Sequence, residues 1–506
     1  MHTRALSWLR SNEERIAPSV YALALLGAVS VWLLAVRAPL WLDETGSYWN
    51  IAGGFHQIWS RSIELNSFPA YFYVLWATNA IFGTHEVVLR IPSLLAMLAA
   101  TYVFYCSARE LFAWDVARMA TVLFILNRRI VFAAIDVRPY AFALLVTNLA
   151  ILCLLRWRKT SSKTGKTRYA ALLGIASAGI FFFHYLFGCI VAAFVVIYLV
   201  DAGRRHSLFA ELRPFVVAAG CFALLMLPVL PRLWYLHQTS NTHVFADPPS
   251  FKLFLRALSP GPAAFVLVGA ILLAALMRKL AKPNPQNLSQ LMVSAALALV
   301  PLAILYGVSV ATPMHIFIPR YETVAVPGVS FGWAWIFSLI DSPRLRLAAC
   351  SAFVACAVCL TCLSPTAFTH GDTWKYALEF ADANAARDGS PLIICSDLPE
   401  ADFQPMPAGP LGESVLFSPL GYYRVRATVV PMPRTLNEQA QAIGARFAER
   451  AGLDHRRFLA LGYRASYPTL EWLRSQTSST HAARVLGEFE SVRVVEFSPL
   501  EPARGK

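Results

Sequence analysis

Two adjacent carboxylates, Asp43 and Glu44, follow the first apolar stretch of the chain and lie in an aromatic segment, residues 41–49. A charged side chain beside a membrane costs free energy unless it is solvated or has a function. Such a pair can act as a general base, a metal ligand, a proton relay in a transporter, or the structural partner of an arginine such as Arg61 or Arg90. The pair by itself leaves all four roles open.

A second motif, Asp136-Val137-Arg138-Pro139-Tyr140, sets an acid and an arginine two residues apart. Proline suits the first turn of a helix, and the N-terminal end of a helix favours a negative ligand. An arginine beside such an end is the outline of a phosphate site. In the alternative interpretation, Asp136 caps the helix and Arg138 reaches toward lipid headgroups.

The composition determines the class of protein. The chain has 506 residues, of which 57% are hydrophobic and only 15% charged, and its mean hydropathy is +0.51. These values predict a polytopic membrane protein surrounded by membrane lipids. The formal charge of +14 does not indicate a nucleic-acid partner, because the basic residues lie in short loops between apolar runs.

Membrane-length apolar runs are the elements that must position these motifs. One of these runs, residues 69–83, is apolar and aromatic but only about 15 residues long, which is typical of an interfacial segment rather than a span. We therefore expect about eleven membrane helices. They are expected near residues 18–36, 89–111, 116–134, 139–156, 169–183, 185–201, 214–231, 262–277, 289–310, 321–340 and 346–363.

Loop charge predicts which side each motif faces. Residues 156–168 hold a cluster of six basic residues without an acid, which should lie in the cytoplasm together with the N-terminus. With eleven spans, the loop 37–88, the turn at Asp136, and the C-terminal tail then lie outside. We therefore expect a multi-pass membrane protein with a cytoplasmic N-terminus and a C-terminal domain on the outer side.

The tail differs in composition from the rest of the chain, because it is polar and has no membrane-length run. It is long enough for one soluble domain. We divide the chain into a membrane domain, residues 1–363, and an α/β domain, residues 364–506. Strands are expected at 391–396, 424–431, 457–463 and 484–497, with an amphipathic helix at 437–451.

Six short motifs carry a family resemblance, which covers residues from about 35 to 340. They are Trp41-Leu42-Asp43-Glu44, Asn66-Ser67-Phe68-Pro69-Ala70-Tyr71-Phe72, Leu89-Arg90-Ile91-Pro92-Ser93, Val137-Arg138-Pro139-Tyr140, His184-Tyr185-Leu186-Phe187-Gly188 and Pro319-Arg320-Tyr321. In this order they resemble bacterial membrane glycosyltransferases of the GT-C fold, in particular the family 39 or RgtA/B/C/D-like branch. That branch is similar to protein O-mannosyltransferases and lipid A aminoarabinose transferases.

The resemblance implies inverting transfer of a sugar from a polyprenyl phosphate to a hydroxyl of a lipid such as lipid A, a cell-envelope glycan or a protein. It also implies that the chain lies in the bacterial inner membrane, with its C-terminal domain in the periplasm. Asp43, with Glu44 beside it, would be the catalytic acid of the first outer loop, and Asp136 would occupy the second acidic position. Arg138 and Arg320 would lie near the lipid phosphate. The other residues of these motifs that we expect to bind substrate are Tyr71, Arg90, Tyr140, His184 and Tyr321.

The physical requirements of such a reaction agree with this assignment. Displacing a polyprenyl phosphate by a hydroxyl needs a base for the proton and cations for the charge that grows on the departing phosphate. Asp43 supplies the first, and Arg138 or Arg320 the second. No cofactor is required by the sequence, although a divalent ion, Mg²⁺ or Mn²⁺, could bridge the acid pair and the donor phosphate.

Two questions stay open at this level. Arg128 and Arg129 lie within an expected span, where they must reach the headgroups, face a cavity or bind an anion. A transporter or flippase of a glycolipid without transferase activity is the alternative function. It would require acids inside the spans, broken helices and a repeat, and the sequence has no clear repeat.

Overall fold

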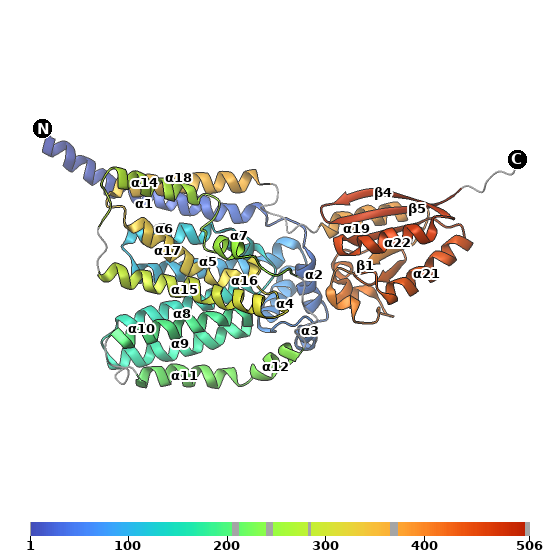
Figure 1. The fold of residues 1–506 in the computed structure, drawn as a ribbon, viewed down its shortest axis with the longest axis horizontal. Helices are drawn as coiled ribbons and strands as arrows, with labels where there is room; N and C mark the ends of the chain where they lie inside the picture. The colour runs from blue at the N-terminus through green and yellow to red at the C-terminus, as the bar shows by residue number, and fades with distance from the viewer. Residues whose placement is uncertain (1, 205–211, 239–245, 282–284, 365–372, 501–506) are drawn as a thin grey trace.

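The computed structural model describes residues 2–204, 212–238, 246–281, 285–364 and 373–500. A layered bundle of helices forms most of the molecule, and the tail forms a separate α/β domain at one end of that bundle (Figure 1). The chain thus has the expected class, a mainly α-helical bundle with a C-terminal α/β domain.

The bundle is built from the first eighteen helices within the described ranges. They are α1 His2–Leu34, α2 Leu42–Ala52, α3 Ile58–Glu64, α4 Ala70–Phe82, α5 Glu86–Leu111, α6 Trp114–Ile125, α7 Arg128–Ile135, α8 Tyr140–Lys159, α9 Lys163–Phe183, α10 Ile190–Arg204, α11 Leu212–Met226, α12 Leu230–Gln238, α13 Phe251–Ala257, α14 Ala264–Leu276, α15 Pro285–Ala311, α16 Pro319–Glu322, α17 Val326–Ser338 and α18 Pro343–Leu363.

One apolar core runs through the bundle. Helix α8 packs between α5 and α9, and α17 packs against α15 and α6. Phe104 of α5 stacks on Phe124 of α6 and on Phe331 of α17, with ring centroids 4.4 and 4.7 Å apart. Offset aromatic stacking of this kind adds to the free energy of simple burial, so these rings join three helices at the centre of the core.

The described helices confirm membrane character but not the expected number of spans. Five of them are long and apolar enough to cross a membrane, and a sixth crossing results if the bent pair α11 and α12 counts as one. Eleven spans therefore stays a prediction. The expected helix at 116–134 is interrupted, because α6 ends at Ile125 and α7 starts after Asn127, whose side chain accepts from the Arg129 N–H.

The tail is a three-layer α/β domain. Its sheet has the order β2-β1-β3-β5-β4, in which β1 is parallel to β2 and β3, and β5 is antiparallel to β3 and β4. Alternate residues of β1 face opposite layers: Leu392 packs toward α19, and Ile393 toward α21 and α22. The elements are α19 Trp374–Ala385, β1 Leu392–Cys395, α20 Ser418–Tyr422, β2 Val429–Met432, α21 Glu438–Leu453, β3 Phe458–Tyr463, α22 Tyr467–Thr477, β4 His481–Phe489 and β5 Val492–Pro499.

One expectation for the tail is wrong. The run 484–497 is not a single strand but parts of β4 and β5, joined by a tight turn in which Glu490 has a φ of 54°. The two strands share the same β-favouring composition, so the run reads as continuous unless the turn is recognised.

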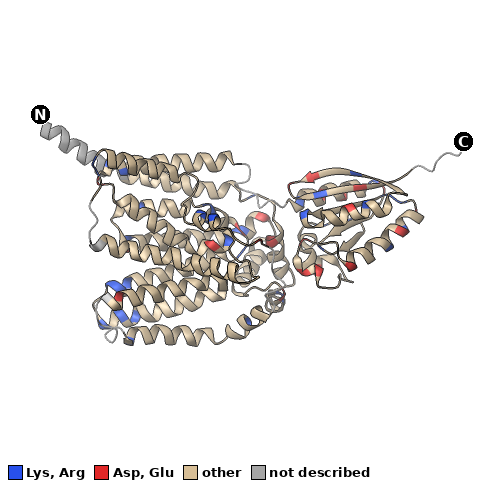
Figure 2. Cartoon of the chain, in the orientation of Figure 1, with Lys and Arg blue, Asp and Glu red and all other residues tan. Residues whose placement is uncertain are grey.

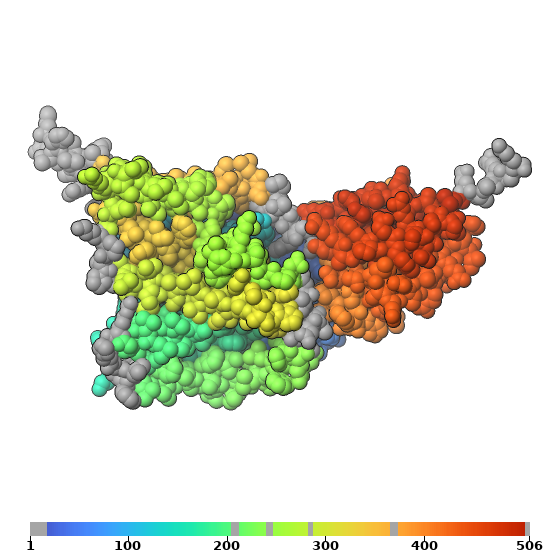
Figure 3. All heavy atoms as spheres, viewed as in Figure 1, coloured from blue at the N-terminus to red at the C-terminus, as the bar shows by residue number. Residues whose placement is uncertain are grey.

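The bundle and the tail share one cluster of buried apolar side chains. It includes Leu40, Trp49 and Tyr71 from the membrane part, and Trp374 and Phe417 from the tail. In the space-filling view the tail lies against the end of the bundle (Figure 3). The segment that carries the acid pair is therefore packed between the two parts of the chain.

Candidate active site

Asp43 lies in the first turn of α2, directly after the short segment that connects it to α1. Its Oδ2 accepts a hydrogen bond from Arg320 Nη1 of α16 at 2.5 Å, across 277 residues of sequence. The Asp43 side chain keeps 19% of its surface exposed. The carboxylate is thus held by a cation and still accessible.

The turn between α7 and α8 brings the second acid to the same place. Trp41 Nε1 donates to Asp136 Oδ1 at 3.2 Å, and Arg138 Nη1 donates to the backbone oxygen of Asp43 at 3.4 Å. Burial raises the pKa of Asp136 to about 6, although Arg138 and the Trp41 hydrogen bond act in the opposite direction. Asp136 therefore exchanges a proton close to physiological pH.

Glu44 has a different environment from its neighbour. Its side chain is 1% exposed, and Oε2 accepts from Arg90 Nη2 at 2.7 Å while Oε1 accepts from the Val137 N–H at 2.9 Å. Arg90 also donates to the backbone oxygens of the segment after α1 and of α7. These oxygens belong to Val36, Ala38, Pro39 and Ile135. Glu44 and Arg90 thus connect α2, α5 and the 136–138 turn behind Asp43.

Aromatic rings form the opposite wall of the site. His184 lies between Tyr140 and Tyr321, with ring centroids 5.1 and 5.3 Å from its own. Burial, followed by the positive charges of Arg138 and Arg320, lowers the pKa of His184 to about 3. The imidazole is therefore neutral at physiological pH and can offer a hydrogen bond but no charge.

Three buried polar atoms at this place have no hydrogen-bond partner within the described ranges: His184 Nδ1, Tyr140 Oη and Arg138 Nε. An unpaired buried polar group costs roughly 1–3 kcal/mol, so such groups are rare in folded proteins. The rings of Tyr140 and His184 are in contact, and Arg138 interacts electrostatically with both. Three such atoms beside Asp43 indicate where the polar groups of a ligand belong.

Tyr71 lies behind this wall rather than in it. Its ring is fully buried, and its Oη is 3.4 Å from Ser93 Oγ, which in turn donates to the backbone oxygen of Arg138 at 3.4 Å. Tyr71 thus supports the 136–138 turn. The structure brings the other expected residues together from α2, α5, the 136–138 turn, α8, α16 and the segment before η2 Tyr185–Cys189.

Sequence reasoning missed two features of the site. Trp41 was seen only as aromatic surroundings, yet it binds Asp136 and its ring lies 5.8 Å from the Arg320 guanidinium. Arg129 was expected to reach the headgroups, face a cavity or bind an anion, and its Nε donates to Glu322 Oε2 of α16 at 2.9 Å. Glu322 is visible in the sequence as an acid at the end of an expected span, but its pairing with Arg129 is not.

Each acid of the site has a protein partner. Asp43 is held by Arg320, Asp136 by an indole, and Glu44 by Arg90. Among the described residues, no three His, Cys, Asp or Glu side chains lie close enough to share an ion. A cation site built from three protein ligands does not fit this arrangement.

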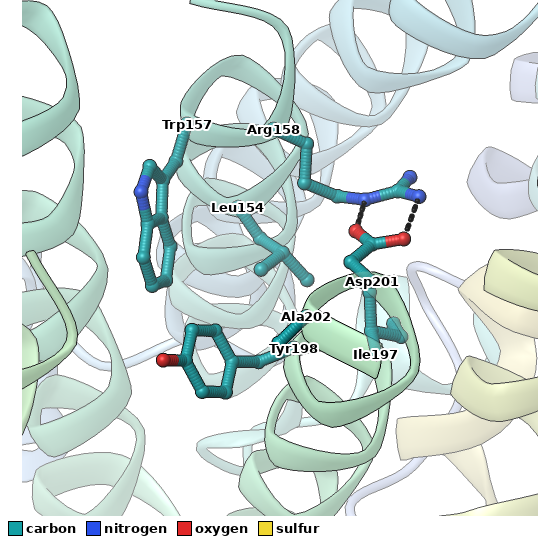
Figure 4. A pocket seen from close by; sticks show the side chains of 7 residues that line it. All are labelled: Leu154, Trp157, Arg158, Ile197, Tyr198, Asp201 and Ala202. Atoms are coloured by element: carbon teal, nitrogen blue, oxygen red, sulfur yellow. Dashed lines mark hydrogen bonds and ion pairs between the residues drawn. The ribbon is translucent and has the colours of Figure 1, made fainter. Parts of the chain in front are cut away.

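A separate cavity lies at the other end of the bundle, between α8 and α10 (Figure 4). Its walls include the stacked rings of Trp157 and Tyr198 and the ion pair of Arg158 with Asp201. Its volume is about 30 Å³, room for about one water molecule. Arg158 lies roughly 27 Å along α8 from Tyr140, so this cavity is not part of the site.

Comparison with known proteins supports the expected resemblance. Residues 66–234 match a family model described as dolichyl-phosphate-mannose-protein mannosyltransferase. The crystal structure of ArnT from Cupriavidus metallidurans bound to undecaprenyl phosphate superposes with a TM-score of 0.54 at 12% identity, covering 94% of this chain and 97% of that chain. No curated protein matches the sequence.

The Archaeoglobus fulgidus oligosaccharyltransferase tethered with an acceptor peptide is more distant. It has a TM-score of 0.47 at 13% identity, and covers 96% of this chain and 75% of that chain. The ArnT superposition, together with the family match over part of the chain, confirms the GT-C fold and the resemblance to mannosyltransferases and aminoarabinose transferases.

Proposed function

We propose that this chain is an inverting glycosyltransferase that moves a sugar from a polyprenyl phosphate to an acceptor hydroxyl. One observation carries the proposal: Asp43, Arg138 and Arg320 converge with three unpartnered buried polar atoms at one place. The GT-C fold and the undecaprenyl phosphate bound to the ArnT structure support this substrate class.

In the proposed reaction, the acceptor oxygen attacks the anomeric carbon from the side opposite the phosphate. A bond forms between that oxygen and the anomeric carbon, and the bond from this carbon to the phosphate oxygen breaks. Asp43 takes the acceptor proton, because its carboxylate pairs with Arg320 and is still accessible. The polyprenyl phosphate leaves as an anion, whose charge Arg138 and Arg320 stabilise.

The other residues receive roles that follow from their contacts. We assign Tyr140, His184 and Tyr321 to substrate binding, because two of them present unpartnered polar atoms and the third completes their wall. We assign Glu44, Arg90 and Tyr71 to positioning, since their polar atoms bind protein groups. Asp136 holds Trp41 and can also accept a proton near neutral pH.

The proposed side of the membrane follows from the distribution of charge. The basic end of α8, with Arg156, Arg158 and Lys159 in its last turn, lies at the end of the bundle away from the tail (Figure 2). Basic residues accumulate on the cytoplasmic side. We therefore propose that the site and the tail, residues 364–506, face the outer side of the inner membrane.

The test uses the full chain reconstituted in lipid vesicles, with undecaprenyl phosphate carrying one radiolabelled sugar, tried with hexoses and pentoses in turn. Release of free undecaprenyl phosphate measures use of the donor. Asp43→Asn is expected to lower this rate about 100-fold or more, the range for loss of a general base. Arg138→Ala is expected to weaken donor binding.

A matched control is Asp201→Asn, which removes another arginine-paired carboxylate at the other end of the bundle. It should leave donor use within about twofold, and all variants should retain their thermal unfolding transition. Donor use that survives Asp43→Asn would remove Asp43 from the mechanism. Movement of a labelled lipid between leaflets with no sugar released from any donor would favour the flippase instead.

A further inference from the structure

The tail contacts the helix that carries Asp43 through hydrogen bonds at three levels. Just before α2, the Leu40 N–H donates to Tyr423 Oη at 2.7 Å. In the first turn, Thr45 Oγ1 is 3.0 Å from Ser418 Oγ. In the last turn, Trp49 Nε1 donates to the backbone oxygen of Glu413 at 2.8 Å.

The direction of the middle bond can be assigned. A hydroxyl has one hydrogen to donate, and Thr45 Oγ1 already donates to the backbone oxygen of Leu42 at 2.7 Å. Ser418 must therefore be the donor to Thr45. Both residues are fully buried, so the bond is not exchanged with water. Tyr48 and Tyr422 meet edge to face nearby, with centroids 4.9 Å apart.

These contacts lie on one side of α2 and Asp43 on the other. At 3.6 residues per turn, Asp43 is about 200° around the helix from Thr45. The tail thus contacts one face of the helix, while the carboxylate of Asp43 on the opposite face binds Arg320. An additional link holds the tail to the bundle, because Lys375 Nζ is 3.0 Å from Glu86 Oε1 of α5.

Helix α2 depends on such support. It has 11 residues, and isolated helices shorter than about 12–15 residues are marginal in water. It is followed by Gly53 and Gly54, the second with a φ of 86°, which end the helix. Its conformation is therefore set by the surfaces on either side of it.

We propose that the C-terminal domain is a working part of the active site, in which Ser418 and Tyr423 are positioning residues that hold α2 so that Asp43 meets its substrate. The inference rests on the proposed function for its effect on catalysis, but its structural part stands alone. Ser418 and Tyr423 then act on the rate of transfer through α2.

Hydrogen–deuterium exchange of the full chain in lipid nanodiscs tests the structural part. A neutral hydrogen bond contributes a factor of about five, so Ser418→Ala with Tyr423→Phe should raise exchange across 42–52 about 25-fold. The β1 and β3 amides should exchange as before. Tyr467→Phe is the matched control, because that hydroxyl binds Ser491 within the tail.

Transfer kinetics test the functional part. The double variant should lower kcat about tenfold with the donor KM unchanged within twofold. A chain with Ser418→Thr and the native Tyr423 keeps both hydroxyls and should keep most of the rate. Unchanged exchange over 42–52 in the double variant would overturn the proposal even if the unmodified chain transfers sugar. Increased exchange in a chain that transfers no sugar would instead refute the proposed function and leave the positioning of α2 intact.

Discussion

Replacing Glu44 by glutamine tests whether this acid is structural. The carboxylate accepts hydrogen bonds from the Arg90 guanidinium and from the backbone N–H groups of Trp41 and Val137. In Glu44→Gln one acceptor oxygen becomes an amide donor, which must face one of these donors. The same change leaves Arg90 buried without its counter-charge.

The magnitude follows from burial. Removing one partner of a buried ion pair costs about 3–5 kcal/mol, and the Glu44 and Arg90 side chains are 1% and 3% exposed. Four backbone oxygens still bind Arg90 in the variant. We therefore expect the lower end of the range, about 3 kcal/mol.

The assay is unfolding in detergent, followed by heat and by denaturant, with Glu110→Gln as the matched control. Glu110 pairs with Arg156 and Lys159 at the other end of the bundle, where its side chain is 25% exposed. An exposed pair contributes about 0–1 kcal/mol. Equal unfolding transitions for the two variants would refute a structural role for Glu44.

Two further predictions concern other parts of the fold. Because burial raises the pKa of Asp136 from 3.8 to about 6, the folded chain retains a proton that the unfolded chain releases between these values, so stability falls as pH rises through this window. The melting-temperature gain of Asp136→Asn should grow from pH 4 to pH 6 and then level off; a gain that is constant with pH contradicts this. In α17, Gly328→Ala should destabilise by about 1–3 kcal/mol, because its Cβ would lie 2.3 Å from the Ala298 backbone nitrogen of α15. Gly332→Ala, with open space around its Cβ, should instead stabilise by roughly 0.5–1 kcal/mol, and equal melting temperatures for the two variants would be the contrary result.

Much of the fold was predictable because it depends on local composition. Long apolar runs predict helices in a bundle, and the polar tail with β-branched runs predicts an α/β domain. The break after Ile125 and the hairpin at Glu490 were not predicted, because only two residues interrupt the pattern in each case. The number of spans is likewise beyond what hydropathy establishes.

The site shows the same division. The sequence by itself determined which side chains could do chemistry, since Asp43, Asp136 and Arg138 are unusual beside a membrane whatever surrounds them. Only the tertiary structure decided their partners. Asp43 meets Arg320 across 277 residues, and the adjacent Glu44 turns into the core because consecutive residues of a helix point about 100° apart.

The contact between the tail and α2 was likewise not predictable from the sequence. Nothing in the local pattern around Ser418 or Tyr423 relates them to the acid pair almost four hundred residues earlier. Sequence periodicity reports which face of an element is apolar, and therefore that the element will be buried. Which surface buries it is chosen by the packing of the whole chain, and that packing placed the α/β domain against the helix that carries Asp43.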